Sequence, residues 1–344
     1  MKNSKAYFRG CMIGGAVGDA LGYPVEFLSL DEIRETYGEK GIQEPVCEEA
    51  TGKALVSDDT QTLAFTMDGL LWADRKAKEK GIYAYTPCIF YAYQKWLYTQ
   101  TGHFAEKSYE FLLQGEILKW EELFARRTPG ESILQALAGS INGKYGTMRN
   151  PINNSKGYNT VARVAPVGLY FYEDPRKAFK IGCESAAITH GHPTAYLTAG
   201  FFAHLISMII RGISLEQAAE VSVKNLSLHK HSEESVGALK RAMELAGSDA
   251  PEEKAIASLG EGWTAEEAMA IALYAALKHP EDYETALRTV VNQSGNSDGT
   301  GAICGNLLGA YLGTLEIPYR WMQNVELSEL MSIGADRLLA AVMD

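Results

Sequence analysis

Residues 294–313, SGNSDGTGAICGNLLGAYLG, join an oxygen-rich turn to a run of small and apolar residues. From Gly301 to Gly313 a glycine recurs at every fourth position. Residues four apart share one face of a helix, so one face of the helix predicted here would carry no side chains. Such a face permits very close packing against another helix. The stretch therefore predicts a tightly packed helical core.

The N-terminal stretch GGAVGDALG, residues 14–22, is similarly poor in large side chains. Each glycine inside a helix costs about 1 kcal/mol relative to alanine, so another interaction must offset that cost. Close helix packing is the simplest explanation. The stretch does not match the dinucleotide-binding fingerprint, because no strand precedes it and no βαβ unit follows.

Helical signals recur along the rest of the chain. Apolar residues follow helical spacing in residues 59–72, 90–97, 193–210 and 268–277, and no comparable series of alternating strands is present. The polar loop at residues 142–159 is long enough to suggest a function. No repeat, linker or low-complexity segment interrupts the pattern. The sequence predicts an all-α fold, a compact bundle of many helices.

Capping signals predict four helix starts. In each, the first residue would accept a hydrogen bond from a backbone N–H of the first turn. Two are capping boxes and two place a cap before a proline: Ser29 with Glu32, Thr264 with Glu267, Thr86 with Pro87, and Asp174 with Pro175.

The formal net charge of the 344 residues is -11. Such a field repels phosphate backbones, so nucleic acid is not an expected partner. An anionic small ligand would need a local site of helix N-termini or a cation. The cysteines form no CxxC pair, which predicts reduced, mostly buried thiols at Cys11, Cys47, Cys88, Cys183 and Cys304.

The N-terminus lacks the apolar core of a signal peptide. The most apolar stretch, residues 195–210, is short for a membrane span and is interrupted by His204. We therefore expect a cytoplasmic protein without membrane association.

Two carboxylates, Asp58 and Asp59, stand between the hydroxyl residues Ser57 and Thr60 where a loop enters a predicted helix. These four side chains could bind a hard cation through oxygen. Asp and Ser at a helix start more commonly serve as caps that complement the helix dipole. Taken alone, the motif is better explained as a cap.

Asn296 and Asp298 form a second oxygen-rich cluster, and the glycines around them free the backbone to fold around a ligand. Taken alone, this pattern is better explained as an ordinary capped loop, because the spacing resembles that of many turns.

His190 and His192 lie in a turn before an apolar stretch, where an imidazole could donate to a phosphate. Zinc is less favoured, because only Glu184 lies near in sequence as a further ligand. His192 is best explained as a structural residue.

Five motifs occur in order over residues 8–315. They are GGAVGDALGYPVEF (14–27), SDDTQT (57–62), NPINNSKG followed by ARVAPVGL (150–169), ITHGHP (188–193) and NQSGNSDGTGAICGNLLGA (292–310). Each motif alone is weak, but the ordered set resembles the ADP-ribosylglycohydrolase family. This family includes the dinitrogenase-reductase-activating glycohydrolases and the ADP-ribosyl-acceptor hydrolases.

The resemblance implies one domain over residues 1–344, an orthogonal helix bundle with a central cleft that holds two Mg²⁺ or Mn²⁺ ions. Metal-binding positions of the family match side chains from both ends of the chain. Asp298 matches the carboxylate that bridges both ions. The full set of implied metal ligands is Ser57, Asp58, Asp59, Asn296 and Asp298.

The implied reaction is hydrolysis of the bond between ADP-ribose and a modified protein side chain or small acceptor. A divalent cation would orient the ribose hydroxyls and lower the pKa of bound water, while a carboxylate transfers a proton. Nearby carboxylates would stabilise the oxocarbenium character of the transition state. The catalytic candidates are Asp59, Asp298 and Glu26, which matches a mobile acidic residue of the family.

The resemblance also implies where ADP-ribose would bind. His190 matches the family's histidine near the pyrophosphate. Ser155, Gly157 and Tyr158 match the loop that holds the phosphates and the distal ribose. Backbone N–H groups and His190 would thereby offset the negative field of the chain.

This sequence departs from the family pattern at both places. Family members usually carry aspartate at the position of Asn296 and serine or threonine at that of Gly299, so we expect the second ion to bind more weakly. Tyr158, Asn159 and Thr160 are larger than the residues usual in the substrate loop.

Two hypotheses follow from these departures. The chain is a hydrolase with an altered substrate, or it is a catalytically weakened member that binds ADP-ribose or a partner, for example to block a toxin. A scaffold role has little support, because it would not need both acidic clusters.

Overall fold

The computed structural model describes residues 1–343 and confirms the all-α prediction. Elements labelled η are 3-10 helices. The first half contains α1 (Lys5–Gly22), η1 (Tyr23–Val25), α2 (Leu30–Tyr37), α3 (Asp58–Lys80), α4 (Tyr85–Thr101), η2 (Lys107–Gln114), η3 (Glu116–Lys119), η4 (Glu121–Phe124), α5 (Glu131–Ala138), α6 (Asn159–Ala162) and α7 (Ala165–Tyr170).

The second half contains α8 (Pro175–Ala187), α9 (Pro193–Ile210), α10 (Leu215–Leu226), α11 (Glu233–Ala246), α12 (Glu252–Leu259), α13 (Ala265–Lys278), α14 (Tyr283–Val291), α15 (Ser297–Leu312), η5 (Thr314–Glu316), α16 (Tyr319–Met322) and α17 (Ser328–Met343). Extended pairing within residues 1–343 is limited to isolated bridges, one of which joins Gly157 to Thr264.

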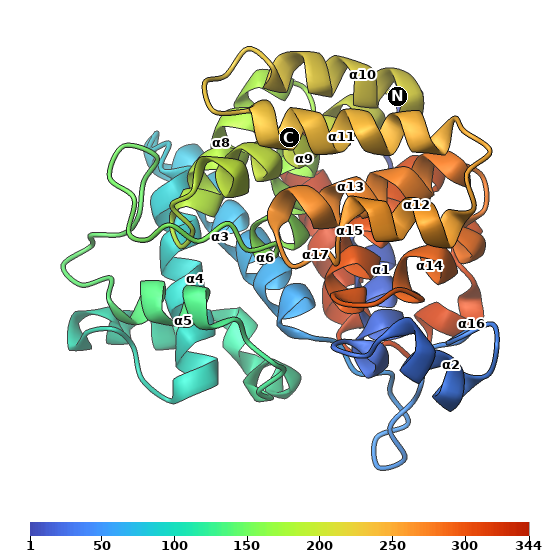
Figure 1. The fold of residues 1–344 in the computed structure, drawn as a ribbon. Coiled ribbons are helices and arrows are strands. Elements are labelled where there is room, and N and C mark those ends of the chain that lie inside the picture. The colour runs from blue at the N-terminus through green and yellow to red at the C-terminus, as the bar shows by residue number, and fades with distance from the viewer. Residues whose placement is uncertain (344) are drawn as a thin grey trace.

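The glycine face of α15 packs antiparallel against a glycine face of α1 in the interior of the bundle (Figure 1). A Cβ at Gly305 would lie 2.1 Å from the backbone oxygen of Gly14, and one at Gly301 would lie 2.3 Å from that of Gly18. Both distances are far below van der Waals contact, so the two helix backbones touch. This contact brings the N-terminal and C-terminal motifs together.

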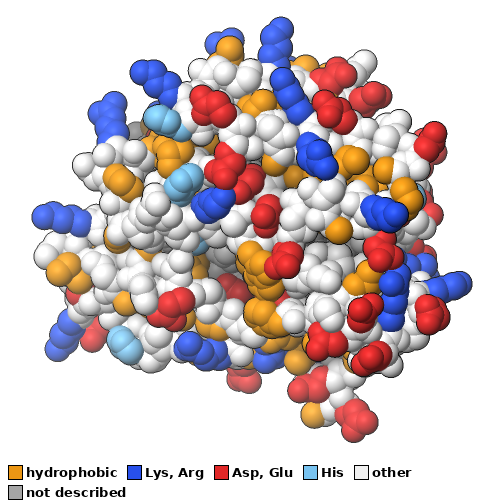
Figure 2. Space-filling view, in the orientation of Figure 1, with side chains coloured by type: hydrophobic (Ala, Val, Ile, Leu, Met, Phe, Trp, Pro, Cys, Tyr) orange, Lys and Arg blue, Asp and Glu red, His pale blue; other side chains and the backbone are white. Residues whose placement is uncertain are grey.

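Helix α9 is a core helix. Its mean hydropathy of 1.4 and its length would suit a membrane span, but 83% of it is buried inside the protein. The contacts of its apolar side chains with the rest of the core explain that composition. Figure 2 shows acidic and basic side chains interspersed over one face of the molecule, without a continuous basic patch there.

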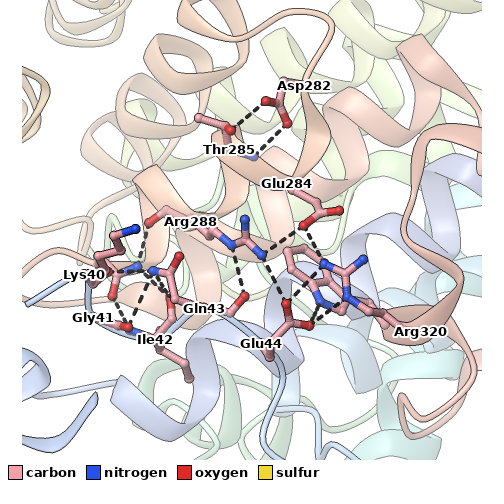
Figure 3. Close-up of polar contacts among 12 residues, drawn as sticks. Lys40, Gly41, Ile42, Gln43, Glu44, Asp282, Glu284, Thr285, Arg288 and Arg320 are labelled. Carbon is pink, nitrogen blue, oxygen red and sulfur yellow. Dashed lines mark hydrogen bonds and ion pairs between the residues drawn. The ribbon is translucent and has the colours of Figure 1, made fainter. Parts of the chain in front are cut away.

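The loop between α2 and α3 is held by an ion-pair network on α14 and α16 (Figure 3). Glu44 accepts hydrogen bonds from Arg288 and Arg320, both at 3.1 Å, and also from the Trp321 indole. Glu284 pairs with the same two arginines, at 2.9 and 2.6 Å. These contacts fix the segment that leads into the first acidic motif.

Three of the four predicted helix starts are confirmed, and two of these three carry the predicted side-chain cap. Ser29 and Glu32 form a complete capping box, and Asp174 caps α8 with Pro175 in its first turn. Helix α4 begins at Tyr85, so the prediction of Thr86 as its cap was wrong. The Thr86 hydroxyl instead donates to Glu184 at 2.7 Å.

Thr264 precedes α13 as predicted, but its side chain caps nothing and its hydroxyl has no hydrogen-bond partner among the described residues. The first N–H of the helix, at Ala265, donates instead to the carbonyl of Lys156 at 2.9 Å. A carbonyl from a distant loop therefore binds the first N–H of the helix, and the predicted capping box is absent. All five cysteines are free thiols, and Cys47 alone is exposed.

Candidate active site

Asp19 holds the first turn of α3. It is fully buried, and it is the one acidic residue of α1. Its carboxylate accepts hydrogen bonds from the N–H groups of Ser57 and Thr60, at 2.9 and 3.1 Å, and from the Thr60 hydroxyl. Ser57 is the cap of α3 and accepts from the Asp59 N–H at 3.1 Å. The cap expected for Ser57 is thus present, and it leaves the carboxylates of Asp58 and Asp59 for another role.

The predicted carboxylates lie at the N-termini of α3 and α15, near enough for their charges to interact. Asp59 and Asp298 are fully buried. Asp59 Oδ1 accepts from Asn159 Nδ2 at 2.7 Å, and Asp298 Oδ1 accepts from the Gly299 N–H at 2.8 Å. The Oδ2 atom of each aspartate has no hydrogen-bond partner within residues 1–343. Burying a carboxylate oxygen without a hydrogen-bond partner costs free energy unless a proton or a cation binds to it.

Electrostatic repulsion links four acidic groups at this place. Burial is the main cause that raises the pKa of Asp58, Asp59, Asp298 and Glu26 above their usual range. The neighbouring carboxylates raise it further, with Asp298 the largest such neighbour of both Asp58 and Glu26. A positive charge among them would relieve both the burial and the repulsion.

The donor set fits a hard cation such as Mg²⁺ or Mn²⁺, because it consists of oxygen atoms alone. Within residues 1–343, no group of three or more His, Cys, Asp or Glu side chains is placed so that it could hold a metal ion by itself. Hydroxyl groups and water would have to complete the coordination sphere, and Mg²⁺ normally keeps several waters in proteins.

Asn296 caps α15. Its Oδ1 accepts from the Gly299 N–H at 3.3 Å, and its Nδ2 donates to the carbonyl of Gly262 at 2.6 Å. Both ends of the amide are therefore engaged within the protein. If Asn296 is a metal ligand as predicted, its Oδ1 must accept the hydrogen bond from the Gly299 N–H and coordinate a cation at the same time.

Gly299 and Tyr158, which both depart from the family pattern, lie in contact with each other. A Cβ at position 299 would lie 2.3 Å from Cε2 of the Tyr158 ring. Burial, and then Asp59 and Asp298, raise the pKa of the Tyr158 phenol well above its usual range. The ring thus occupies the space of a side chain at position 299, and the phenol lies close to the carboxylates.

We expect Gly299→Ser to be destabilising in the natural chain and less so when combined with Tyr158→Ala. Urea unfolding of both single variants and the double variant would measure the coupling, which we expect to be about 1 to 3 kcal/mol. The close contact of the new side chain with Asn296 Nδ2, at 2.6 Å, is common to both backgrounds and cancels. Additive effects of the two substitutions would show that they do not share space.

The predicted substrate loop packs against His190. Asn153 joins the loop to the histidine turn, because its Oδ1 accepts from the N–H groups of Ser155 and Gly191, each at 3.0 Å. A Cβ at Gly157 would lie 3.0 Å from His190 Nε2, so glycine lets the loop pass close to the imidazole. Burial lowers the pKa of His190 to about 3, so the ring is neutral at pH 7.

A buried arginine connects the carboxylates with His190. Arg163 is fully buried and donates to Asn159 Oδ1 at 2.9 Å and to Thr189 Oγ1 at 2.6 Å. Asn159 in turn donates to Asp59, and the Thr189 hydroxyl lies 2.8 Å from His190 Nδ1. The two groups of predicted site residues therefore form one hydrogen-bonded system.

Aromatic rings and strained backbone flank Glu26. Thr128 donates to Glu26 Oε2 at 3.2 Å, and both Thr128 and Phe27 have positive φ, at 47° and 69°. The ring of Phe27, which is 63% exposed, stacks on Trp263 with 5.2 Å between centroids. Left-handed backbone at residues other than glycine is strained and concentrates at functional sites.

Sequence reasoning did not assign Asp19, Asn159, Arg163 or Thr128 to the site. Only Asp19 carried a readable signal, since it is the one acidic residue in a helix of mostly small and apolar residues. The other three are recognisable only from their partners in the fold.

Asp19→Asn is expected to destabilise the protein by about 2 kcal/mol or more, because every group that faces the carboxylate is a donor and the new amide NH₂ cannot accept. Thermal unfolding would measure the loss, with the exposed Asp249→Asn as the matched control. Equal melting temperatures for the two variants would contradict this role.

These features define an all-α protein in which both ends of the chain build a buried acidic centre. A family model described as ADP-ribosylglycohydrolase matches residues 2–344, and the chain belongs to this family. The chain is 26% identical over 333 residues to an uncharacterized protein of Archaeoglobus fulgidus, covering 96% of this chain and 95% of that protein. It is 23% identical to ADP-ribosylhydrolase ARH3 of Gallus gallus, covering 93% and 89%.

A solved structure described as an ADP-ribosylglycohydrolase-related protein complex has a TM-score of 0.62, is 23% identical, and covers 100% of both chains. This likeness confirms the fold. Family membership and the similarity to ARH3 support ADP-ribosyl hydrolase activity in general.

Proposed function

We propose that the chain is a cation-dependent hydrolase that cleaves the glycosidic bond between ADP-ribose and a modified protein side chain or small acceptor. The observation that carries the proposal is the pair of buried oxygens, Asp59 Oδ2 and Asp298 Oδ2, that lack a hydrogen-bond partner within residues 1–343. The two aspartates come from opposite ends of the chain. Because both contribute to one acidic centre, we also propose that residues 1–344 form a single domain.

In this proposal Ser57, Asp58, Asp59 and Asp298 hold Mg²⁺ or Mn²⁺ through oxygen. When bound, the cation would orient the ribose hydroxyls and lower the pKa of an adjacent water. A second ion would bind more weakly, because Asn296 contributes no charge and Gly299 no hydroxyl.

The remaining residues act on the substrate. Glu26 would transfer a proton at the scissile bond, since burial beside Asp298 favours its protonated form at neutral pH. The neutral His190 and the loop with Ser155, Gly157 and Tyr158 would bind the pyrophosphate and distal ribose. Buried Arg163 would fix the position of Asn159, which in turn donates to Asp59, and so hold the substrate loop in place relative to the carboxylates.

The direct test is release of ADP-ribose from ADP-ribosylated arginine and serine substrates, with Mg²⁺ or Mn²⁺ and with a chelator. We expect release that the chelator abolishes and that added cation restores. Absence of release from every substrate, in folded protein that binds ADP-ribose in calorimetry, would refute the proposal.

The second candidate is a family member that binds ADP-ribose or a partner without turnover. The Tyr158 ring against Gly299 favours it, since the ring fills space beside the carboxylates. Calorimetry with ADP-ribose separates the two candidates. If Asp59→Ala keeps the biological effect of the protein but loses cation binding, the binding role is correct.

A further inference from the structure

A cavity of about 750 Å³ lies between α3, α17 and the 3-10 segment 107–124. Met67 is the lining residue of α3 nearest in sequence to Asp59, and it lies roughly 12 Å further along the helix at 1.5 Å per residue. The cavity is therefore separate from the carboxylates. Its volume lies within the range of pockets that bind small molecules.

One part of the lining is apolar. Leu71 and Trp72 on α3 contribute to it, together with Trp120 after η3 and the buried Leu330 on α17. Phe111, which is 53% exposed, stands beside them. Half-buried indole rings and exposed apolar side chains around a concave surface are typical of a ligand pocket.

Another part of the lining is basic. Four basic side chains, Arg75, Lys95, Lys119 and Arg337, line the cavity against two acidic ones, Asp68 and Glu116. This local excess of positive charge occurs in a chain whose net charge is -11. A local excess of positive charge attracts anions.

The acidic residues do not neutralise all four cations. Asp68 pairs with the buried Lys95. Glu116 reaches Arg337 only at 3.7 Å, and both are exposed. Within residues 1–343, neither Arg75 nor Lys119 forms an ion pair with a carboxylate. Two unpaired cations therefore remain available beside the apolar lining.

We infer that this cavity is a second ligand site, for a small amphipathic anion with an apolar body and one carboxylate or sulfonate group. The apolar body packs against Leu71, Trp72 and Trp120, and the anionic group meets Arg75 and Lys119. The inference does not depend on the proposed hydrolase activity, because the two sites share no residue.

The test uses the full chain and 8-anilinonaphthalene-1-sulfonate, an aromatic sulfonate whose fluorescence rises on binding. We expect one saturable site. The double charge reversal Arg75→Glu with Lys119→Glu should weaken binding at least about tenfold, or about 1.4 kcal/mol. The matched control, Lys224→Glu with Lys230→Glu, makes the same change in net charge at exposed positions and should bind like the natural chain.

Competition identifies the site and the chemistry recognised. Decanoate, an acyl carboxylate, should displace the probe, whereas ADP-ribose and inorganic phosphate at the same concentration should not. Displacement by ADP-ribose would place the probe at the carboxylate site and overturn the inference. Displacement by phosphate would overturn the apolar part of the recognition.

A cavity-filling variant guards against an effect of charge alone. Leu71→Trp keeps every charge and should reduce probe binding, while circular dichroism verifies folding in all variants. Equal binding by the Arg75/Lys119 variant and its matched control would overturn the inference.

Discussion

Asp59→Asn is expected to lower the rate of ADP-ribose release by about a thousandfold or more while the protein stays folded. The substitution removes one negative charge from the proposed cation site but keeps an oxygen that can accept from Asn159. A catalytic cation contributes several kcal/mol of transition-state stabilisation, and each 1.36 kcal/mol is about tenfold in rate. Steady-state assays would measure the loss of rate, and calorimetry with Mn²⁺ would measure the loss of cation binding.

Stability separates this result from simple unfolding. Asp59 is a buried acid repelled by its neighbours, so its neutralisation should leave the melting temperature unchanged or raise it. Asp249→Asn, at an exposed position, should change neither activity nor stability. If the variant keeps an activity within tenfold of that of the natural protein, Asp59 is not a catalytic residue.

The second large effect concerns the fold itself. Gly305→Ala is expected to destabilise the protein by about 3 kcal/mol or more, a large share of the stability of a typical domain. The new Cβ would lie 2.1 Å from the backbone oxygen of Gly14. Backbone atoms of a packed helix cannot move aside as a flexible side chain can, so α1 and α15 would have to separate.

Gly237→Ala is the matched control, because Gly237 is also inside a helix but has open space around its Cβ position. It should stabilise the protein by up to about 1 kcal/mol, as expected for alanine replacing glycine in a helix. Urea unfolding of both variants measures the difference. Comparable stabilities for the two variants would show that the backbones of α1 and α15 do not touch at Gly305.

Much of the fold was predictable from local pattern. Helical periodicity located the long helices, and the four-residue glycine spacing indicated the close packing that α15 makes. Ser57 and Ser29 were readable as caps because a cap bonds to a backbone group two or three residues away. Such signals depend on neighbours in sequence, which the sequence displays directly.

The helix does begin after Thr264, but the capping box predicted there is absent, for the complementary reason. The first N–H of the helix, at Ala265, donates to the carbonyl of Lys156, which lies more than a hundred residues earlier in the chain. No local pattern can reveal such a partner, since propensity carries no information on which distant segment will dock at a helix end.

The sequence by itself determined the helical class, the glycine faces and the positions of the two acidic motifs, because each depends on spacing within one segment. Only the tertiary structure decided that Asp19 holds the turn at Ser57, that Asn296 is engaged as a cap, and that Tyr158 fills the space above Gly299. Those roles depend on contacts between segments far apart in the chain, which no local pattern in the sequence displays.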